Sequence, residues 1–195
     1  MLEFEKKIML SELEYVFLKD TLFENNDSVE HTNYYYDTND FQMNDLGITC
    51  RVRESNGIFI PTIKEHCKNG TDCSVEHSYS MNTMQDVFIK EMSLSYQGNM
   101  HTFRNVICNQ KNQIAIDKNI YLGVVDYELE VEYEYGYEGS AIFELRKIAN
   151  DLCLANLCVS PEEFLSRIGQ NDNKSKRFFA RKNDLNKQNI CETAQ

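Results

Sequence analysis

The chain begins with Glu3-Phe4-Glu5-Lys6-Lys7, and this stretch is the strongest indication of the fold. Alternate side chains of a β-strand share a face, so Glu3, Glu5 and Lys7 point one way while Phe4 and Ile8 point the other. A single strand with this pattern is typical of a solvated face. The pattern recurs, however, in Arg51 and Arg53, in Thr62 and Lys64, and in Glu128, Glu130 and Glu132. Four such strands predict a shared, charged interior.

Capping and turn signals divide the rest of the chain into further elements. Ser11-Glu12-Leu13-Glu14 has the spacing of a capping box and begins a helix over about residues 12–24. Ser55-Asn56-Gly57 indicates a hairpin, and Pro61 in its second strand requires an edge, a bulge or a late start. Strands are expected at about 32–36, 48–54, 58–64, 73–79, 101–108, 112–118 and 125–135, with helices at about 83–94, from Gly139 and from Ser160.

The order of these elements predicts an α+β fold. Each half of the chain runs strand, helix, strand, strand, strand, a duplicated β-α-β-β-β arrangement that is visible in element order and not in residue identity. Short connections favour antiparallel pairing. Strands that are charged on one face and apolar on the other predict a closed eight-stranded barrel, a tunnel with a polar, charged lumen and helices packed outside. We expect one domain over residues 1–182 and a frayed polar tail over 183–195.

Composition limits the partners of this protein. The 195 residues carry a net charge of −11, and 42% of them are hydrophobic. An acidic surface repels polyanions, which excludes a non-specific binder of nucleic acid or of an anionic membrane. The opening residues hold no signal-peptide core and no stretch approaches the length of a membrane span, so we expect a cytoplasmic protein. An anionic ligand therefore needs a locally basic pocket.

The cysteines and histidines show no metal-binding pattern. The seven cysteines are odd in number and contain no C-x-x-C pair, so we expect free thiols. His31, His66, His77 and His101 share no ligand spacing, which favours solvent exposure or ordinary hydrogen bonding.

Together with Glu3-x-Glu5-x-Lys7, several short motifs give the sequence its resemblance to one family. They are Asn33-Tyr34-Tyr35-Tyr36-Asp37-Thr38, Arg51-Val52-Arg53, Thr62-Ile63-Lys64, Glu76, Arg104, Asp117, Tyr121-Leu122-Gly123, Glu128-Leu129-Glu130-Val131-Glu132 and Lys174-Ser175-Lys176-Arg177-Phe178. Each is weak alone. In this order, over about residues 3–178, they resemble the CYTH, or triphosphate tunnel metalloenzyme, family.

The resemblance implies a cationic cradle for a triphosphate. A triphosphate is densely charged, and breaking its phosphoanhydride bond requires that this charge be neutralised. Arginines offer planar forks to phosphate oxygens, whereas lysines act as point charges. The implied substrate-binding residues are Lys7, Arg51, Arg53, Lys64, Arg104 and Lys176, with Lys174 as the competitor of Lys176.

The resemblance also implies a divalent metal, Mg²⁺ or Mn²⁺, because hard cations prefer carboxylate oxygens. The implied metal ligands are Glu3, Glu5, Asp117, Glu128 and Glu130. The implied catalytic residues are Glu5, Glu76, Asp117 and Lys7, and the general base is not assigned to one carboxylate. Glu132 continues the same strand face but ranks lower, because we expect it near the rim.

Several alternatives stay open at this point. Arg51 and Arg53 could form an exposed strand face, and the row from Glu128 to Glu134 could protect a sheet edge. Inorganic tripolyphosphate is the leading substrate. A dedicated thiamine triphosphatase is disfavoured by the lack of tryptophan, and a class IV adenylate cyclase by His31-Thr32 where such cyclases show His-Phe. A non-catalytic module that binds polyphosphate or nucleotide, and a monomer or homodimer, remain alternatives.

Overall fold

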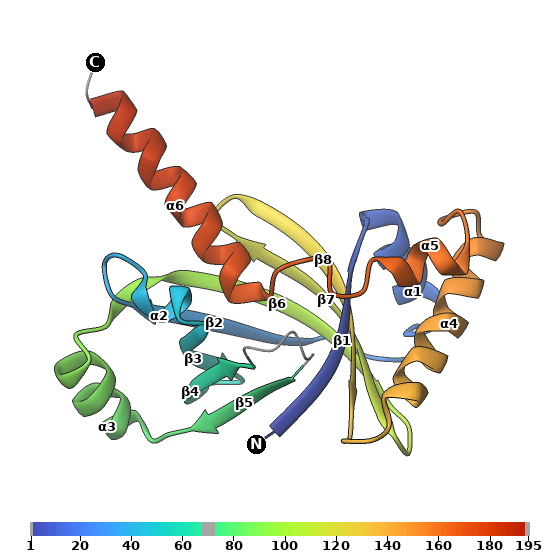
Figure 1. Ribbon diagram of the computed structural model, residues 1–195, viewed down its shortest axis with the longest axis horizontal. Helices are drawn as coiled ribbons and strands as arrows, with labels where there is room; N and C mark the ends of the chain where they lie inside the picture. The colour runs from blue at the N-terminus through green and yellow to red at the C-terminus, as the bar shows by residue number, and fades with distance from the viewer. Residues whose placement is uncertain (1, 68–72, 194–195) are drawn as a thin grey trace.

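Strand alternation closes this chain into a barrel. The computed structural model describes residues 2–67 and 73–193, with side chains as far as Gln188. Within these residues, eight antiparallel strands close in the order β1-β5-β4-β3-β2-β6-β7-β8. The strands are β1 (Leu2–Leu10), β2 (Val29–Asp37), β3 (Ile48–Ser55), β4 (Ile58–His66), β5 (Cys73–Ser78), β6 (Ser95–Cys108), β7 (Asn112–Tyr121) and β8 (Val124–Tyr133). The predicted α+β barrel with outer helices is confirmed (Figure 1).

The duplication is also visible in the element order. The helices are α1 (Glu12–Thr21), α2 (Gln42–Asp45), α3 (Met81–Thr83), the π-helix η1 (Met84–Glu91), α4 (Glu138–Leu154), α5 (Pro161–Ser166) and α6 (Lys174–Thr193). β1, α1, β2, β3 and β4 form the first β-α-β-β-β unit. β5, α3 with η1, β6, β7 and β8 form the second. The predicted capping box at the start of α1 is present, because Ser11 and Glu14 each bond to the other's backbone.

β1 closes the barrel and pairs with two different strands. Its residues from Phe4 to Leu10 pair with β8, whereas only Leu2 to Phe4 pair with β5. The β4–β5 ladder is also partial, since it begins at Thr62. Pro61 therefore lies where β4 changes from an edge paired only with β3 to a strand paired on both sides, which agrees with the edge position that a proline requires.

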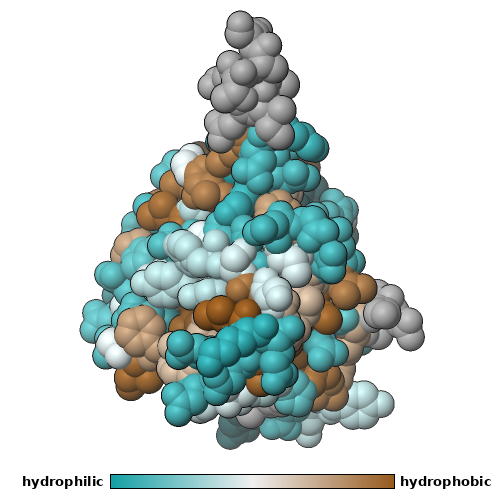
Figure 2. All heavy atoms as spheres, turned by 90° about the vertical axis from the view of Figure 1, so that its left-hand side faces the viewer, coloured by the Kyte–Doolittle hydropathy of each residue, from teal (hydrophilic) through white to brown (hydrophobic). Residues whose placement is uncertain are grey.

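Apolar outer faces of the strands are covered by helices on two sides. α1, α4 and α5 lie along the barrel beside β1, β7 and β8 (Figure 1). Ile8, Leu129, Leu145 and Phe164 are fully buried in the apolar cluster that these elements share. α3 and η1 cover β3, where Val52 packs against Phe88. On the face drawn in Figure 2, hydrophobic residues reach the surface in separate patches among hydrophilic ones. The apolar core therefore lies outside the barrel wall and leaves the lumen to polar side chains.

α6 closes one end of the lumen. Phe178 and Phe179 pack against Tyr35, Met100 and Tyr121, and the rest of the helix runs away from the barrel (Figure 1). The side chain of Phe178 lies so close to Gly98, whose φ is +138°, that a Cβ at Gly98 would stand 2.8 Å from the ring. β6 begins at Ser95 and not near residue 101, because Gly98 interrupts the strand signal of the sequence without ending the strand.

The structure departs from the sequence predictions at two further places. The tail expected to be frayed from residue 183 continues as helix to Thr193. The expectation of free thiols is wrong for four cysteines, which form the disulfides Cys67–Cys73 and Cys153–Cys158. Cys67 and Cys73 meet because the antiparallel β4–β5 pairing brings the two strand ends together. Cys50 and Cys108 are free, and Cys191 lies outside the described side chains.

Among the described residues, no helix combines the length and the apolar character needed to cross a bilayer.

Candidate active site in the barrel lumen

Inward-facing side chains from seven strands and the start of α6 surround one pocket in the lumen. Its volume is about 90 Å³, room for a few water molecules. It is this small because cations and carboxylates from opposite walls reach across it. The lining charged residues are Glu3, Glu5, Lys7, Arg51, Arg53, Lys64, Glu76, Arg104, Glu130, Glu132 and Lys174. The alternation of charge along β1, β3, β4 and β8 is therefore what builds the pocket.

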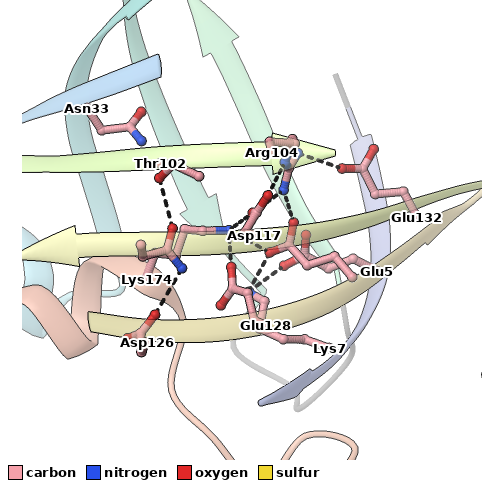
Figure 3. Close-up of polar contacts among 12 residues, drawn as sticks. Glu5, Lys7, Asn33, Thr102, Arg104, Asp117, Asp126, Glu128, Glu132 and Lys174 are labelled. Carbon is pink, nitrogen blue, oxygen red and sulfur yellow. Dashed lines mark hydrogen bonds and ion pairs between the residues drawn. The ribbon is translucent and has the colours of Figure 1, made fainter. Parts of the chain in front are cut away.

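One side of the site is a buried acidic cluster, which we call the inner cluster: Asp117, Glu128 and Glu130. One oxygen from each carboxylate lies within 4.8 Å of the others, and Asp117 and Glu128 are fully buried behind the pocket. Lys174 contacts all three, at 2.7 Å from Asp117 and 3.0 Å from Glu130 (Figure 3). Arg104 bonds both oxygens of Asp117, at 2.8 and 2.7 Å, and also contacts Glu130. Each carboxylate is thus held by a cation.

These ion pairs decide the protonation states of the inner cluster. Burial by itself raises the pKa of Glu130, but Lys174, Arg104 and Lys7 outweigh it and hold that pKa well below its usual range. The pKa of Asp117 is likewise lowered, because Lys174 and Arg104 outweigh its burial. The same contacts raise the pKa of Lys174. Asp117 and Glu130 are therefore ionised.

A second group of carboxylates lies at the pocket itself, and we call it the outer cluster: Glu5, Glu130 and Glu132. Oxygens of the three lie within 4.8 Å of one another. Lys7 stands 3.3 Å from Glu5 and 3.2 Å from Glu130. The pKa values of Glu5 and Glu130 are lowered, but that of Glu132 is raised. Burial and the negative charges of Glu130 and Glu5 raise it despite the nearby Arg104. A carboxylate whose pKa is raised by burial and by neighbouring negative charges marks a place where a cation is favoured.

The two arginines on β3 differ in their partners. Arg51 donates from Nε to Thr62 at 3.0 Å and from Nη2 to Glu76 at 2.7 Å. Arg53 donates from Nε to the amide oxygen of Asn33 at 3.0 Å, and no described carboxylate lies within ion-pair distance of it. The neighbouring charge of Arg51, together with burial, lowers the pKa of Arg53 to about 9. Among the described cations that line the pocket, Arg53 is therefore the one whose charge is least compensated.

The remaining predicted residues take different positions. Lys64 pairs with Glu3 at 3.0 Å, so both line the pocket, but Glu3 belongs to neither carboxylate cluster. Lys176 does not line the pocket: its side chain is 52% exposed and lies 3.3 Å from Asp172. Lys174, the competing candidate, is the residue that enters the lumen.

Three residues that the sequence reasoning ranked low or missed also belong to this region. Glu132 faces the pocket, as the continued alternation on β8 indicates. Arg177 reaches behind Lys174 and bonds Glu128 at 2.7 Å, and its place in a helical turn carried no strand signal. His66 lines the pocket, where burial and Lys64 lower its pKa to about 4, so it is neutral.

The start of α6 adds to the cationic wall. Asn173, Lys174 and Ser175 line the pocket, and Asn173 caps the helix by accepting from the backbone of Lys176 at 2.9 Å. The amide groups in the first turn of a long helix carry partial positive charge. Ser175 ties this turn to β3 through Thr49, with 2.6 Å between the hydroxyl oxygens.

The donor set fits a hard divalent cation. Both carboxylate clusters found among the described residues offer only oxygen ligands, which Mg²⁺ and Mn²⁺ prefer over nitrogen or sulfur. The outer cluster is the better candidate, because all three of its carboxylates line the pocket, whereas Asp117 and Glu128 are fully buried and do not line it. Glu5, Glu130 and Glu132 would therefore hold the ion.

A closed antiparallel barrel with a charged lumen and a duplicated strand order defines the structural class of this protein. A family model, the CYTH domain, matches residues 1–156. The chain therefore belongs to the CYTH domain family.

Relatives agree with this membership. A Bacillus subtilis (strain 168) protein called "Putative triphosphatase YjbK" is 27% identical over 158 residues, covering 73% of this chain and 83% of that protein. A crystal structure from Bacillus halodurans, called a "putative adenylate cyclase", shares the fold with a TM-score of 0.65 at 24% identity, covering 91% of this chain and 97% of the other. A "putative adenylyl cyclase" from Hippeastrum has a TM-score of 0.56 at 14% identity, covering 80% and 88%.

Proposed function

We propose that this protein is a divalent-metal-dependent triphosphatase that hydrolyses a small triphosphate, with inorganic tripolyphosphate as the leading substrate. One observation carries the proposal: a small lumen pocket brings six cationic side chains together with an oxygen-only carboxylate group. A triphosphate needs the first and a divalent ion needs the second. The name of the Bacillus subtilis relative supports the same activity.

The cations divide into two roles. Arg53, Arg51 and Lys64, on β3 and β4, bind and orient the phosphate chain from one wall. Lys7, Arg104 and Lys174 all contact Glu130, and from there they stabilise the negative charge that develops on the leaving phosphate. A pocket lined by converging charges also excludes bulk water, which strengthens each of these interactions.

The carboxylates divide in the same way. Glu5, Glu130 and Glu132 would hold the metal, which when bound neutralises phosphate oxygens and makes water a better nucleophile. Asp117 was expected to be catalytic, but its ionised, buried carboxylate is bonded to Arg104 and Lys174, so it orients those cations. Glu76 holds Arg51 in the same manner.

Phosphate release is the direct test. Purified protein is supplied with tripolyphosphate, thiamine triphosphate or ATP, each with Mg²⁺, with Mn²⁺ or with chelator. We expect metal-dependent release that is fastest from tripolyphosphate. Faster phosphate release from thiamine triphosphate, or formation of cyclic AMP from ATP, would change the proposed substrate and leave the proposed site unchanged. Tight binding without turnover of any of the three would show a non-catalytic binding module.

A further inference from the structure

The residue that orients the Arg53 side chain lies on the neighbouring strand. Asn33 on β2 is directly opposite Arg53 on β3 in the antiparallel register. Both side chains point inward, and the amide oxygen of Asn33 accepts from Nε of Arg53 at 3.0 Å. The terminal nitrogens of Arg53 have no hydrogen-bond partner among the described residues. The contact thus fixes the guanidinium by one edge and leaves the other edge to the pocket.

The orientation of the Asn33 amide follows from hydrogen-bond chemistry. A guanidinium only donates, so the amide must turn its oxygen to Arg53 and its nitrogen away. Asn33 is fully buried, and its Nδ2 has no hydrogen-bond partner among the described side chains and backbone (Figure 3). A buried amide that is half unsatisfied costs stability. Holding Arg53 in place is a function that accounts for this cost.

The neutrality of Asn33 is the second part of the argument. Arg51 and Arg104, the nearest comparable arginines, are held by carboxylates. The neighbour of Asn33 on the same inward face is His31, which is also buried. Burial and the charge of Arg53 lower the pKa of His31 to about 3, so it too is neutral. β2 therefore presents Arg53 with polar groups that orient it and do not cancel its charge.

We propose that Asn33 is a positioning residue of the triphosphate site, which holds Arg53 by Nε and leaves its terminal nitrogens and its positive charge to a phosphate group of the substrate. This inference rests on the proposed function and deepens it. It identifies β3, at Arg53, as the place where the pocket has positive charge in excess. A phosphate at this place would accept two hydrogen bonds from the terminal nitrogens of Arg53, as a bidentate pair.

The test compares two substitutions that separate orientation from charge. Asn33→Asp keeps the shape and adds a carboxylate that pairs with Arg53, whereas Asn33→Ala removes the contact. Binding of tripolyphosphate is measured by calorimetry in chelator, where no metal-dependent turnover occurs, and KM and kcat are measured with Mg²⁺. We expect Asn33→Asp to raise Kd about 100-fold and Asn33→Ala about tenfold, with KM following Kd and kcat changing by less than about threefold.

A double-mutant cycle and a surface control make the test specific. If Asn33 acts through Arg53, adding Asn33→Ala to Arg53→Ala changes Kd by less than about twofold. Asn99→Asp on the exposed side of β6 adds the same charge away from the lumen, and we expect an unchanged Kd. Circular dichroism melting curves show which variants are folded. If Asn33→Asp does not fold, the double-mutant cycle of Asn33→Ala and Arg53→Ala decides the test.

The failures of the two proposals are distinguishable. Wild-type protein that binds none of the three triphosphates overturns the proposed function and this inference with it. Wild-type binding together with wild-type affinity in both Asn33 variants overturns the inference alone. An Asn33→Ala effect that is as large in the Arg53→Ala background as in the wild type also overturns it, because Asn33 then acts independently of Arg53.

Discussion

Arg104 and Arg53 stand in the same lumen with opposite surroundings. Arg104 lies among Asp117, Glu130 and Glu132, and these charges raise its pKa despite its burial. Arg53 lies beside the neutral amide of Asn33 and the positive charge of Arg51, and its pKa is lowered. Both are cations in a restricted space, but only one is compensated. A charge that is already paired holds the architecture, whereas an unpaired one is available to a ligand.

The largest test of this contrast is Glu130→Gln, which removes the carboxylate shared by the inner and outer clusters. Glu130 faces Lys7, Arg104 and Lys174 at once. We expect metal-dependent turnover to fall by about 1,000-fold, because the metal ligand and the alignment of three cations are lost together.

Glu134→Gln is the matched control, since Glu134 follows on the same alternation but is exposed beyond the end of β8. We expect its turnover to equal that of the wild type. Steady-state phosphate release checks both variants, and calorimetry checks that Glu130→Gln still binds tripolyphosphate. Unchanged turnover in Glu130→Gln would remove the carboxylate clusters from the mechanism.

The next largest effect separates Lys174 from Lys176, two lysines that lie two positions apart in the sequence. Lys174→Ala should lower kcat/KM by about 100-fold, because Lys174 bridges the inner cluster and the pocket. It should also lower the free energy of unfolding by about 3 kcal/mol, since buried carboxylates lose a partner. Lys176→Ala removes an exposed pair with Asp172 and should change either quantity little.

Kinetics at a temperature well below both melting transitions, with urea unfolding in parallel, separates activity from stability. Equal effects of the two lysine substitutions would contradict the position of Lys174 in the lumen. A loss confined to Lys176→Ala would restore the original prediction for that residue.

The smallest effect is a pH-dependent change in stability at Glu132. Its pKa is raised in the folded protein, so ionising it opposes folding above the ordinary glutamate range, and this cost vanishes once the group is protonated. Glu132→Gln should therefore raise the free energy of unfolding at pH 7, by less than about 1 kcal/mol because the side chain is 35% exposed.

The gain should disappear near pH 4, and urea unfolding at the two pH values measures it. Turnover should fall at the same time, since stability and function oppose each other at a metal site. Glu132→Gln that destabilises the protein at both pH values would show that the carboxylate is held by Arg104 and not repelled by its acidic neighbours.

The barrel itself was predictable because its signal is local. The segments from Glu3 to Ile8 and from Glu128 to Glu132 alternate charged and apolar residues with a period of two. This alternation places Glu5, Lys7 and Glu130 on the inward face whichever strands are neighbours. The capping box of α1 is local in the same sense. Neither depends on the rest of the chain.

Contacts between distant segments were not predictable in this way. Lys174 lines the lumen and Lys176 does not, because only one side of the first turn of α6 faces the lumen. Consecutive residues of a helix point about 100° apart, so the two lysines point in different directions. The disulfide Cys67–Cys73 depends on the pairing of β4 with β5.

By itself, therefore, the sequence determined which residues face the lumen and what charge they bring, because strand alternation is a property of neighbouring residues. Only the tertiary structure decided how those charges are paired. Asn33 meets Arg53, and Asp117 meets Arg104, through the register of adjacent strands. Register joins residues that are far apart in the chain, and among the described arginines of the pocket it leaves Arg53 uncompensated while Arg51 and Arg104 are paired.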